Sequence, residues 1–568
     1  MTTNKDFAEI FEEFAQILDL KGDIRFKIVA YENAAQAIND SPRQVVDIYK
    51  EGGVKALEKI HGVGGGIASK IEEYIKTGKM KELVELKKDF PEIELEIMKI
   101  PSVGPKTARK IYQEFKIKKF SEVEPKLKKD GLKFFHPKTL ENILDGIRIM
   151  KSFSGRMLLV DAKVYVDELI EYLELDKNAI NITAVGSYRR NKETVGDIDL
   201  VASSADSEAT IEHFAKFNEF KDIIVKGDNK STALHKSGFT VDILILSAEE
   251  FGSLLQHFTG SKEHNVALRT HAQLRGMSVS EHGIKILKTG KTQMFETEEG
   301  VYGQLGLKYI DPDLREDRGE IDAALHDKLP KLINLKDIKG DLHAHSKWSD
   351  GTATIEEMVA SAEKLGYEYI AISDHTVSLG IARGLDEKRF LERRAEIEKV
   401  QKKFPKIKIL DSCEVNIKPD GSLDLPDELM ASFDIVTASV HWSLKQSRED
   451  MTNRLISAIE NPNIDIVGHP TGRIINEREG YDADWDQVFK ACVKNNVALE
   501  INAYPNRLDL TDNLVFEARK YGVKFAICTD SHSVEQLNNM CFGVSVARRG
   551  WCEKKDILNT QSFDKFAN

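Results

Sequence analysis

Three aspartates in two predicted strands could hold a pair of divalent cations. Asp197 and Asp199 lie in "VGSYRRNKETVGDIDLV" (185–201), separated by one isoleucine, so in a strand both carboxylates point to the same face. Like charges on one face are unfavourable unless a cation lies between them, and the alternative is a solvated strand edge. Asp242, in the apolar run "GFTVDILIL", supplies a third carboxylate that is costly to bury unpaired. The three residues predict a site for two Mg²⁺ or Mn²⁺ ions about 4 Å apart.

Groups that suit phosphate precede these carboxylates. Gly186 and Ser187 open a predicted helix, and Arg189 and Arg190 follow them. Guanidinium groups and the N–H groups of a helix N-terminus both bind phosphate oxygens. We therefore expect a phosphate-binding site beside the metal pair.

Six histidines after residue 340 fall at or just beyond the ends of predicted strands, and acidic residues accompany them. The histidines are His343, His345, His375, His441, His469 and His532, and the acidic residues are Asp350, Asp374, Glu414 and Asp530. A lone histidine is more often structural than a ligand, but six at one rim are hard to explain in that way. Imidazole and carboxylate together suit Zn, Mn or Fe and do not suit Ca. Several such ions close together would activate a water and clamp an in-line attack at phosphorus.

Two glycine-rich helix connections predict a grip on a nucleic-acid backbone. "IHGVGGGIASKI" (60–71) and "IPSVGPKTARKIY" (100–112) each read as helix, turn and helix. The glycines permit a tight turn, and the N–H groups that open the second helix form an anion cradle. One copy is a weak signal, since glycine turns also serve as simple helix connections. Two copies, the second followed by Lys106, Arg109 and Lys110, are stronger.

The elements that must position these groups change along the chain. The first 150 residues have apolar positions spaced by three and four, as in helices, and the next 180 mix helices with β-rich runs. After a linker, seven β-rich runs alternate with amphipathic helices, the pattern of a parallel α/β barrel with functional residues at the strand ends. The predicted domains are 1–80, 81–150, 151–250, 251–328 and 341–568, with 329–340 as the linker.

Bulk composition limits the class of protein. With 568 residues the chain exceeds what one core holds, so several domains are expected. The net charge of −12 argues against a surface coated with nucleic acid, yet residues 51–150 carry 21 Lys and Arg against 16 Asp and Glu. This asymmetry fits a phosphate-gripping module joined to metal-binding modules, although scatter in surface charge explains it equally well.

The same composition bears on location. Five cysteines without repeated spacing indicate free thiols in a reducing cytosol. The N-terminal sequence has no pattern of a signal peptide, and no apolar run approaches the ~20 residues of a membrane span. We expect a cytoplasmic protein without a membrane partner.

In this order, the motifs resemble the family X DNA polymerases, the group that includes DNA polymerase beta. The paired hairpins, "GSYRR…GDIDL", "VDILIL" and "HFTGSKEHNVALR" (257–269) carry the resemblance over nearly all of residues 1–330. Residues 340–568 resemble the PHP (polymerase and histidinol phosphatase) phosphoesterases, and the whole chain is similar to the bacterial and archaeal form of family X. The resemblance implies a multidomain α+β and α/β fold. Its parts are a helical region with helix-hairpin-helix motifs, a nucleotidyltransferase palm, a small thumb and a distorted (β/α)7 PHP barrel.

The resemblance also implies roles for individual residues. Palm catalysis and metal binding would use Asp197, Asp199 and Asp242, and the dNTP triphosphate would contact Ser187, Arg190 and Gly196. The nucleotide pocket would use His257, Phe258, Gly260 and Asn265, with Arg269 near the template strand. The hairpins would bind DNA through Gly62, Gly64, Gly66, Val103, Gly104, Lys106 and Arg109. Up to three Mn²⁺, Zn²⁺ or Fe²⁺ ions would be held by His343, His345, Asp350, His375, Glu414, His441, His469, Asp530 and His532.

Several positions depart from the family pattern. His257 stands where DNA polymerase beta has a tyrosine in the pair that discriminates the sugar, and Lys262 replaces an acidic residue over the incoming base. Because of the changes at His257 and Lys262, exclusion of ribose and base preference are expected to differ. In the barrel, Asp350 stands near a point where some PHP members have a histidine.

A further resemblance concerns a lyase. In DNA polymerase beta an N-terminal lysine forms a Schiff base with 5′-deoxyribose phosphate, and Lys70 aligns with it, with Lys27 and Tyr31 as supporting groups. Gly66 stands where the family has a second phosphate-binding lysine. Lys70 must lose its proton to attack, which requires a desolvated or cationic setting. The alternative is a solvated helix lysine.

Together these features predict a monomeric DNA repair enzyme with two active sites, associated with the nucleoid when bound to DNA. One site would fill short gaps in gapped or nicked DNA with dNTPs. The other, by resemblance, would be a 3′–5′ exonuclease that also cleaves abasic sites and removes 3′-phosphates. Two alternatives are a small-molecule phosphatase fused to a non-DNA nucleotidyltransferase, and a DNA-binding scaffold with dead sites. The hairpins argue against the first and the complete ligand sets against the second.

Overall fold

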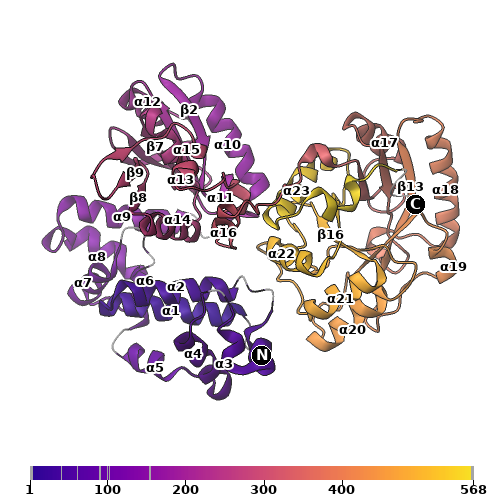
Figure 1. The fold of residues 1–568 in the computed structure, drawn as a ribbon, viewed down its shortest axis with the longest axis horizontal. Helices are drawn as coiled ribbons and strands as arrows, with labels where there is room; N and C mark the ends of the chain where they lie inside the picture. Colours follow the sequence, from indigo (N-terminus) through magenta and orange to yellow (C-terminus); the bar gives the residue numbers. More distant parts are fainter. Residues whose placement is uncertain are drawn as a thin grey trace. The chain divides into compact units, whose positions relative to one another are not determined.

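The computed structural model of the protein describes residues 4–39, 41, 43–60, 62–88, 91–98, 100, 103–152 and 155–563. The chain forms two compact units (Figure 1). The first contains residues 1–155, 171–182 and 196–246, and the second contains residues 156–170, 183–195 and 247–568. No helix in the described part of the chain has the length and apolarity needed to cross a bilayer.

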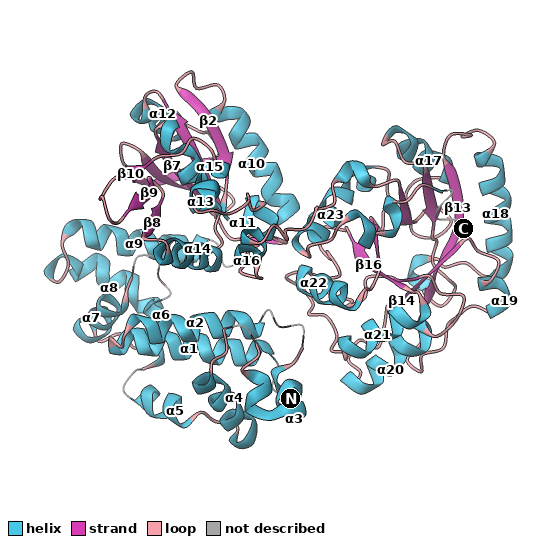
Figure 2. Ribbon diagram, in the orientation of Figure 1, coloured by secondary structure: helices cyan, strands magenta, loops and turns pink. Residues whose placement is uncertain are grey.

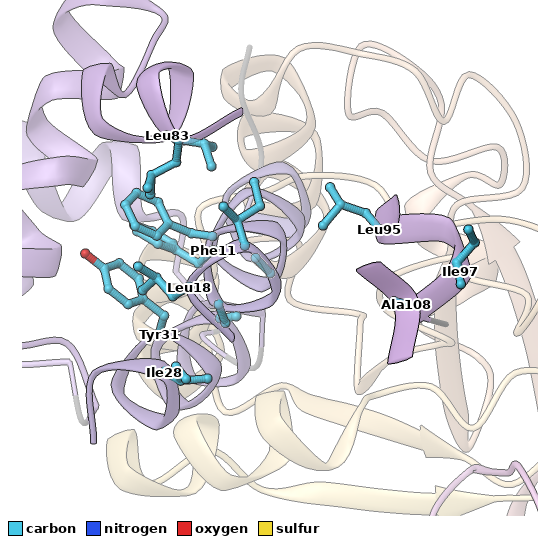
Figure 3. Close-up of a cluster of buried hydrophobic side chains, with 14 of the residues drawn as sticks. Phe11, Leu18, Ile28, Tyr31, Leu83, Leu95, Ile97 and Ala108 are labelled. Atoms are coloured by element: carbon cyan, nitrogen blue, oxygen red, sulfur yellow. The ribbon is translucent and has the colours of Figure 1, made fainter. Parts of the chain in front are cut away.

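The first unit begins with helices packed around one apolar core. They are α1 (Asn4–Lys21), α2 (Arg25–Asn39), α3 (Val45–Leu57), α4 (Gly65–Thr77), α5 (Lys81–Lys88), α6 (Glu92–Met98), α7 (Pro105–Phe115), α8 (Val123–Asp130) and α9 (Pro137–Ser152). On α1, Phe7, Phe11, Phe14 and Leu18 recur at spacings of three and four and are fully buried, so they form one face of the helix. The ring of Tyr31 stacks on Phe14 with centroids 4.4 Å apart, and Figure 3 shows Phe11, Leu18 and Tyr31 close together in this core. The predicted helical character of this region is confirmed.

A five-stranded mixed sheet follows in the palm segment. Its strands are β2 (Ala179–Ala184), β4 (Ile198–Ser204), β5 (Phe220–Lys226), β6 (Lys230–His235) and β7 (Thr240–Leu246), in the order β2-β4-β7-β6-β5. Strands β4 and β7 are parallel neighbours, and β6 pairs antiparallel with both β5 and β7. Helices α10 (Leu159–Leu173) and α12 (Ser207–Phe214) belong to the same segment.

The second unit contains the predicted thumb and some elements that precede it in the chain. The preceding elements are the strand pair β1 (Met157–Leu158) and β3 (Thr194–Val195) and the helix α11 (Gly186–Arg189). The thumb itself has the helices α13 (Phe251–Thr259), α14 (Lys262–Leu274), α15 (Glu298–Gln304) and α16 (Glu320–Leu325), and the sheet of β8 (Met277–Ser280), β9 (Gly283–Ile286) and β10 (Thr292–Gln293). Tyr302 and Ile310 are fully buried in the thumb core. Trp551, from the end of the chain, packs into the same cluster. The thumb and the C-terminal domain therefore share apolar contacts.

The C-terminal domain is a parallel barrel. Its strands are β11 (Gly340–Ala344), β12 (Tyr369–Ile372), β13 (Lys408–Asn416), β14 (Ile435–Ser439), β15 (Ile466–Val467), β16 (Ala498–Asn502) and β17 (Phe525–Cys528), paired in chain order. The helices around them in Figure 2 are α17 (Ile355–Lys364), α18 (Glu387–Gln401), α19 (Asp427–Met430), α20 (Arg448–Ile459), α21 (Trp485–Asn495), α22 (Asp512–Tyr521) and α23 (Met540–Arg549). A parallel bridge between Ala344 and Ser531 brings the ends of the first and last strands together. The seven strands confirm the predicted (β/α)7 barrel, and burial on both faces explains their continuous apolar runs.

Candidate active sites

The carboxyl ends of the barrel strands carry the C-terminal ligand set. His343 lies in β11 and Glu414 in β13, while the other predicted ligands follow their strands within a few residues. Ligand atoms lie within 4.8 Å of one another in three groups, which are His345, Asp350, His375 and His532, then His343, His345 and Asp530, then His375, Glu414 and His441. His345 and His375 each belong to two groups, so the three groups form one connected centre.

Glu414 lies in the middle of this centre and is fully buried. Its Oε2 lies 2.8 Å from His375 Nδ1, and its Oε1 lies 3.0 Å from His469 Nε2 and 3.3 Å from His441 Nε2. Three imidazoles from three strand ends thus converge on one carboxylate. The contact also brings His469 into the site, although it is not a member of the three close groups.

Two residues that sequence reasoning missed orient the histidines. His343 Nδ1 donates to Glu500 Oε1 at 2.7 Å, and His469 N donates to Glu500 Oε2 at 2.5 Å. His441 Nδ1 donates to Asn416 Oδ1 at 2.7 Å. The ring bonds of His343 and His441 fix the tautomer and turn the other ring nitrogen toward the centre, whereas Glu500 holds only the backbone of His469. A signal for Glu500 was present, because it is an acidic residue in the buried strand β16, as Asp242 is in β7.

Asp374, grouped with the ligands by its position after β12, has a different role. Its carboxylate accepts from Ser346 N at 2.8 Å, Ser349 Oγ at 2.7 Å and Arg393 Nη1 at 3.1 Å. It therefore holds the loop between His345 and Asp350.

The site combines depressed and elevated pKa values. Burial lowers the pKa of His345 to about 4, and the charges of His532 and His375 act in the same direction. Burial also lowers the pKa of His532, but this effect is smaller than the opposite effect of the Asp350 and Asp530 carboxylates. The pKa of His532 is therefore raised to about 9. Despite burial, nearby histidines hold the pKa of Glu414 well below its usual value. An ionised Glu414 and a neutral His345 are in the forms that bind metal, whereas His532 would have to lose its proton to serve as a ligand.

The residues fit divalent cations. The buried ring nitrogens His345 Nδ1 and His469 Nδ1 have no hydrogen-bond partner among the described residues. Because buried polar atoms are normally paired, unpaired nitrogens in a cluster of imidazoles and carboxylates are suited to coordination. The donor set matches Mn, Zn or Fe.

In the palm, parallel pairing places Asp199 directly opposite Asp242. Asp197 precedes the first residue of β4 and is exposed. The prediction that both carboxylates lie within the strand is therefore wrong for Asp197, which lies one residue before it. The reason is that the strand begins only after the bend at Gly196. Burial raises the pKa of Asp242 against a hydrogen bond from Thr232, and the charge of Asp197 adds to the rise. Adjacent carboxylates of which one is largely desolvated suit divalent cations that neutralise them.

The predicted triphosphate ligand Arg190 is held in the second unit. Its Nη1 donates to Thr259 O at 2.6 Å and its Nε to Glu316 Oε1 at 2.9 Å. Gly260 makes room for this guanidinium, since an added Cβ would lie 3.1 Å from Arg190 Nη1. Ser187 lies on the short helix α11, and Arg190 is the C-cap residue of that helix.

The predicted nucleotide pocket is built from α13 and α14. Asn265 is buried, and its Nδ2 donates to His257 O at 2.7 Å. The rings of His257 and Phe258 have centroids 5.2 Å apart. Burial lowers the pKa of His257, so the neutral ring is favoured at neutral pH. Arg269 is exposed, and its Nε donates to Asn265 O at 3.0 Å.

The two hairpins present open backbone at the starts of α4 and α7. Gly64 and Gly104 are the N-cap residues, with φ of −81° and −85°. An added Cβ would meet nothing within 4 Å at Gly64, Gly66 or Gly104. Packing and backbone conformation therefore do not require glycine there, and the open space leaves room for a phosphate to approach the backbone. At Gly62, φ of +84° favours glycine for the turn itself.

The side chains around the second hairpin have distinct environments. Val103 is buried in the core, and Lys106 is exposed. Arg109 Nε donates at 2.6 Å to Glu94, whose side chain is 1% exposed. Arg109 therefore neutralises a buried carboxylate.

Lys70 lies in a partly desolvated setting. Its side chain is 17% exposed, forms an ion pair with Glu82, and has its Nζ 5.3 Å from the centroid of the Phe14 ring. Lys27 Nζ lies 3.3 Å from the same Glu82 carboxylate. Burial raises the pKa of Tyr31. The three residues aligned with a lyase centre thus lie around one carboxylate and one aromatic stack.

Comparison with known proteins assigns the domains. Family models match a helix-hairpin-helix domain at 2–80, the DNA polymerase beta palm at 162–266, the DNA polymerase beta thumb at 254–316 and a PHP domain at 341–504. The DNA polymerase/3′-5′ exonuclease PolX of Bacillus subtilis (strain 168) is 36% identical over 563 residues, which cover 98% of this chain and 97% of that protein. The chain belongs to the family X DNA polymerases with a PHP domain.

Two other relatives of this family X polymerase match a smaller share of the chain. A probable phosphatase of Thermoanaerobacter sp. (strain X514) is 30% identical over 233 residues, which cover 39% of this chain and 89% of that protein. A probable phosphatase of Caldicellulosiruptor saccharolyticus is 34% identical over 188 residues, which cover 32% of this chain and 73% of that protein. The likeness to these phosphatases therefore covers less than half of this chain, and the likeness to PolX covers nearly all of it.

Proposed function

We propose that this protein fills short gaps in DNA by template-directed dNTP transfer and shortens DNA from the 3′ end in its PHP domain. The observation that carries the proposal is the connected centre of three ligand groups, present in the same chain as Asp199 paired with Asp242. Near full-length similarity to PolX supports both activities. A small-molecule phosphatase is not favoured, because the phosphatase relatives cover less than half of this chain.

In the palm, Asp197, Asp199 and Asp242 would hold two Mg²⁺ or Mn²⁺ ions. Bound divalent cations supply charge neutralisation and a lowered pKa for the attacking hydroxyl. Ser187, Arg190 and Gly196 would bind the triphosphate, and the pocket of His257, Phe258 and Asn265 would receive the nucleotide. The neutral ring of His257 would select the sugar by its shape and hydrogen bonding.

In the barrel, the nine predicted ligands would hold up to three Mn²⁺, Zn²⁺ or Fe²⁺ ions. Glu500 and Asn416 orient His343 and His441, and Asp374 holds the loop that carries Asp350. Asp350 and His532 are partly exposed and would face the 3′-terminal phosphodiester. The same site would cleave at abasic sites and remove 3′-phosphates, which would leave the 3′-OH that the palm requires.

We also propose how the protein binds DNA, where it acts and a third activity. The hairpin glycines with Lys106 would grip the backbone of gapped or nicked DNA. The enzyme would act as a monomer in the cytoplasm, at the nucleoid when bound to DNA. Lys70 would act as a 5′-deoxyribose-phosphate lyase.

A 5′-labelled primer on gapped DNA tests the proposal. With Mg²⁺ or Mn²⁺ and dNTPs, the full chain should lengthen the primer to fill the gap, and without dNTPs it should shorten the primer. Failure to lengthen the primer would contradict the palm assignment, and failure to shorten it would contradict the exonuclease.

The lyase is tested by covalent trapping. Borohydride should link the wild-type chain to an incised abasic substrate by reducing the Schiff base, and Lys70→Ala should lose the adduct. Lys76→Ala is a matched control, since Lys76 is an exposed lysine on the same helix. Absence of the adduct in the wild type would eliminate the lyase.

A further inference from the structure

The last residue of α23 in the PHP domain, Arg549, contacts the polymerase part of the second unit. Arg549 is 2% exposed. Its guanidinium donates to Arg190 O at 2.6 Å, to Glu316 Oε1 at 3.0 Å and to Asp512 Oδ2 at 2.5 Å. A buried guanidinium requires such partners, and here two of the three belong to the polymerase domain.

Glu316 links Arg549 to the side chain of Arg190. The Glu316 carboxylate accepts from Arg190 Nε at 2.9 Å and from Arg549 at 3.0 Å, and Lys192 Nζ lies 3.8 Å away. Despite burial, these three cations hold the pKa of Glu316 below its usual range. Arg549 thus holds the backbone of Arg190 directly and its side chain through Glu316.

We propose that Arg549 is a positioning residue for nucleotide binding, through which the PHP domain sets the availability of Arg190. This inference rests on the proposed role of Arg190 as a triphosphate ligand. A triphosphate must compete with Glu316 for the Arg190 guanidinium. Arg549 and Lys192 keep Glu316 paired while Arg190 turns to phosphate, so no buried carboxylate is left alone.

Loss of Arg549 should therefore weaken dNTP binding. In Arg549→Ala, Glu316 has fewer cations and retains Arg190 more strongly, and the Arg190 carbonyl loses its donor. The interaction is made with both bound nucleotide and transition state, so its loss raises KM and leaves kcat nearly unchanged. We expect a rise in KM of about tenfold, the effect of one charge-assisted hydrogen bond.

A double-mutant cycle in single-nucleotide gap filling by the full chain tests the inference. Arg190→Ala alone should raise KM for dNTP, and adding Arg549→Ala should raise it no further, because Arg549 acts through Arg190. Arg549→Lys should recover part of the loss, because it restores a cation beside Glu316. Exonuclease activity of each variant, measured in the same preparation, reports that the chain is folded.

Arg548→Ala is the matched control. Arg548 precedes Arg549 on α23 and bonds Asp311, Asp313 and Ile333 O, so it joins the thumb and the PHP domain without touching Arg190 or Glu316. Its KM should stay within about twofold of the wild type.

Additive effects of Arg190→Ala and Arg549→Ala, an unchanged KM in Arg549→Ala, or an equal rise in Arg548→Ala would each overturn the inference. If Arg549→Ala does not fold, Arg549→Gln, which removes the charge but keeps a hydrogen-bond donor, replaces it in the cycle. An unchanged KM in Arg190→Ala would instead show that the proposed role of Arg190 is wrong.

Discussion

At the scale of single residues, Glu500 shows how a group that is not a predicted ligand governs those that are. One carboxylate receives the ring N–H of His343 and the backbone N–H of His469. Both bonds are fully buried, so solvent cannot replace them. The ring orientation of His343 and the backbone position of His469 therefore depend on one side chain of β16.

Glu500→Gln tests this dependence. We expect exonuclease activity to fall by about 10–100-fold, because the neutral amide holds the His343 tautomer less firmly, and dNTP incorporation to persist. Timed degradation of a labelled 3′ end measures the first and gap filling the second. Glu460→Gln, an exposed carboxylate paired with Lys494, should change neither, and full exonuclease activity in Glu500→Gln would contradict the orienting role.

Lys106 and Arg109 provide a second contrast between residues. Lys106→Ala should weaken DNA binding and reduce the slope of log affinity against log salt by about 1, as expected for one lost phosphate contact. Arg109→Ala should lower the free energy of unfolding by about 1–3 kcal/mol, because Glu94 remains buried without its partner. Fluorescence anisotropy across salt concentrations and thermal melting separate the two effects. Equal melting temperatures of wild type and Arg109→Ala would refute the structural role of Arg109.

At the scale of elements, Glu316 lies in the segment before α16 and connects two helices. It bonds Arg190, the C-cap residue of α11, and Arg549, the last residue of α23. Its pKa and that of Asp512 lie below the usual range, since burial is outweighed by surrounding cations. A depressed pKa in the folded state stabilises the protein above the unfolded value, about 4.3 for Glu, and this contribution is lost as pH falls.

Glu316→Gln should therefore melt at a lower temperature than wild type at pH 6, and the difference should shrink between pH 5 and pH 3. Thermal melting across this range, with Glu460→Gln as the exposed control, measures it. A difference that stays constant with pH would contradict the assignment of an ionised Glu316.

Sequence reasoning placed the elements well where local periodicity decides them. The seven barrel strands end next to the predicted ligands because alternation of apolar runs with helices fixes both the strands and their carboxyl ends. It failed where tertiary contacts decide. Nothing near Arg109 indicates that Glu94, on a separate helix, is its partner, and nothing near Arg549 indicates burial at a domain contact. Asp374 is recognised in the sequence only as an acidic residue at a strand end, because the sequence gives its position after β12 but not the direction of its side chain.

At the scale of the molecule, one chain would carry a synthetic activity, gap filling, and a hydrolytic activity, 3′-end degradation. The PHP domain and the thumb share an apolar cluster through Trp551. Arg473 of the barrel also donates to Glu193 at 2.6 Å, three residues before Gly196. These contacts join the polymerase segment to the barrel within the second unit, while each ligand set remains complete by itself. The two activities should therefore be separable by mutation.

Gap filling and 3′-end degradation by two variants of the full chain show whether the two activities reside in separate sites. Asp199→Asn should abolish dNTP incorporation and leave degradation intact, because it alters only the palm carboxylates. His345→Ala should abolish degradation and leave incorporation intact, because His345 belongs to two of the three ligand groups of the barrel. Loss of both activities in either folded variant would contradict the account of two separate active sites.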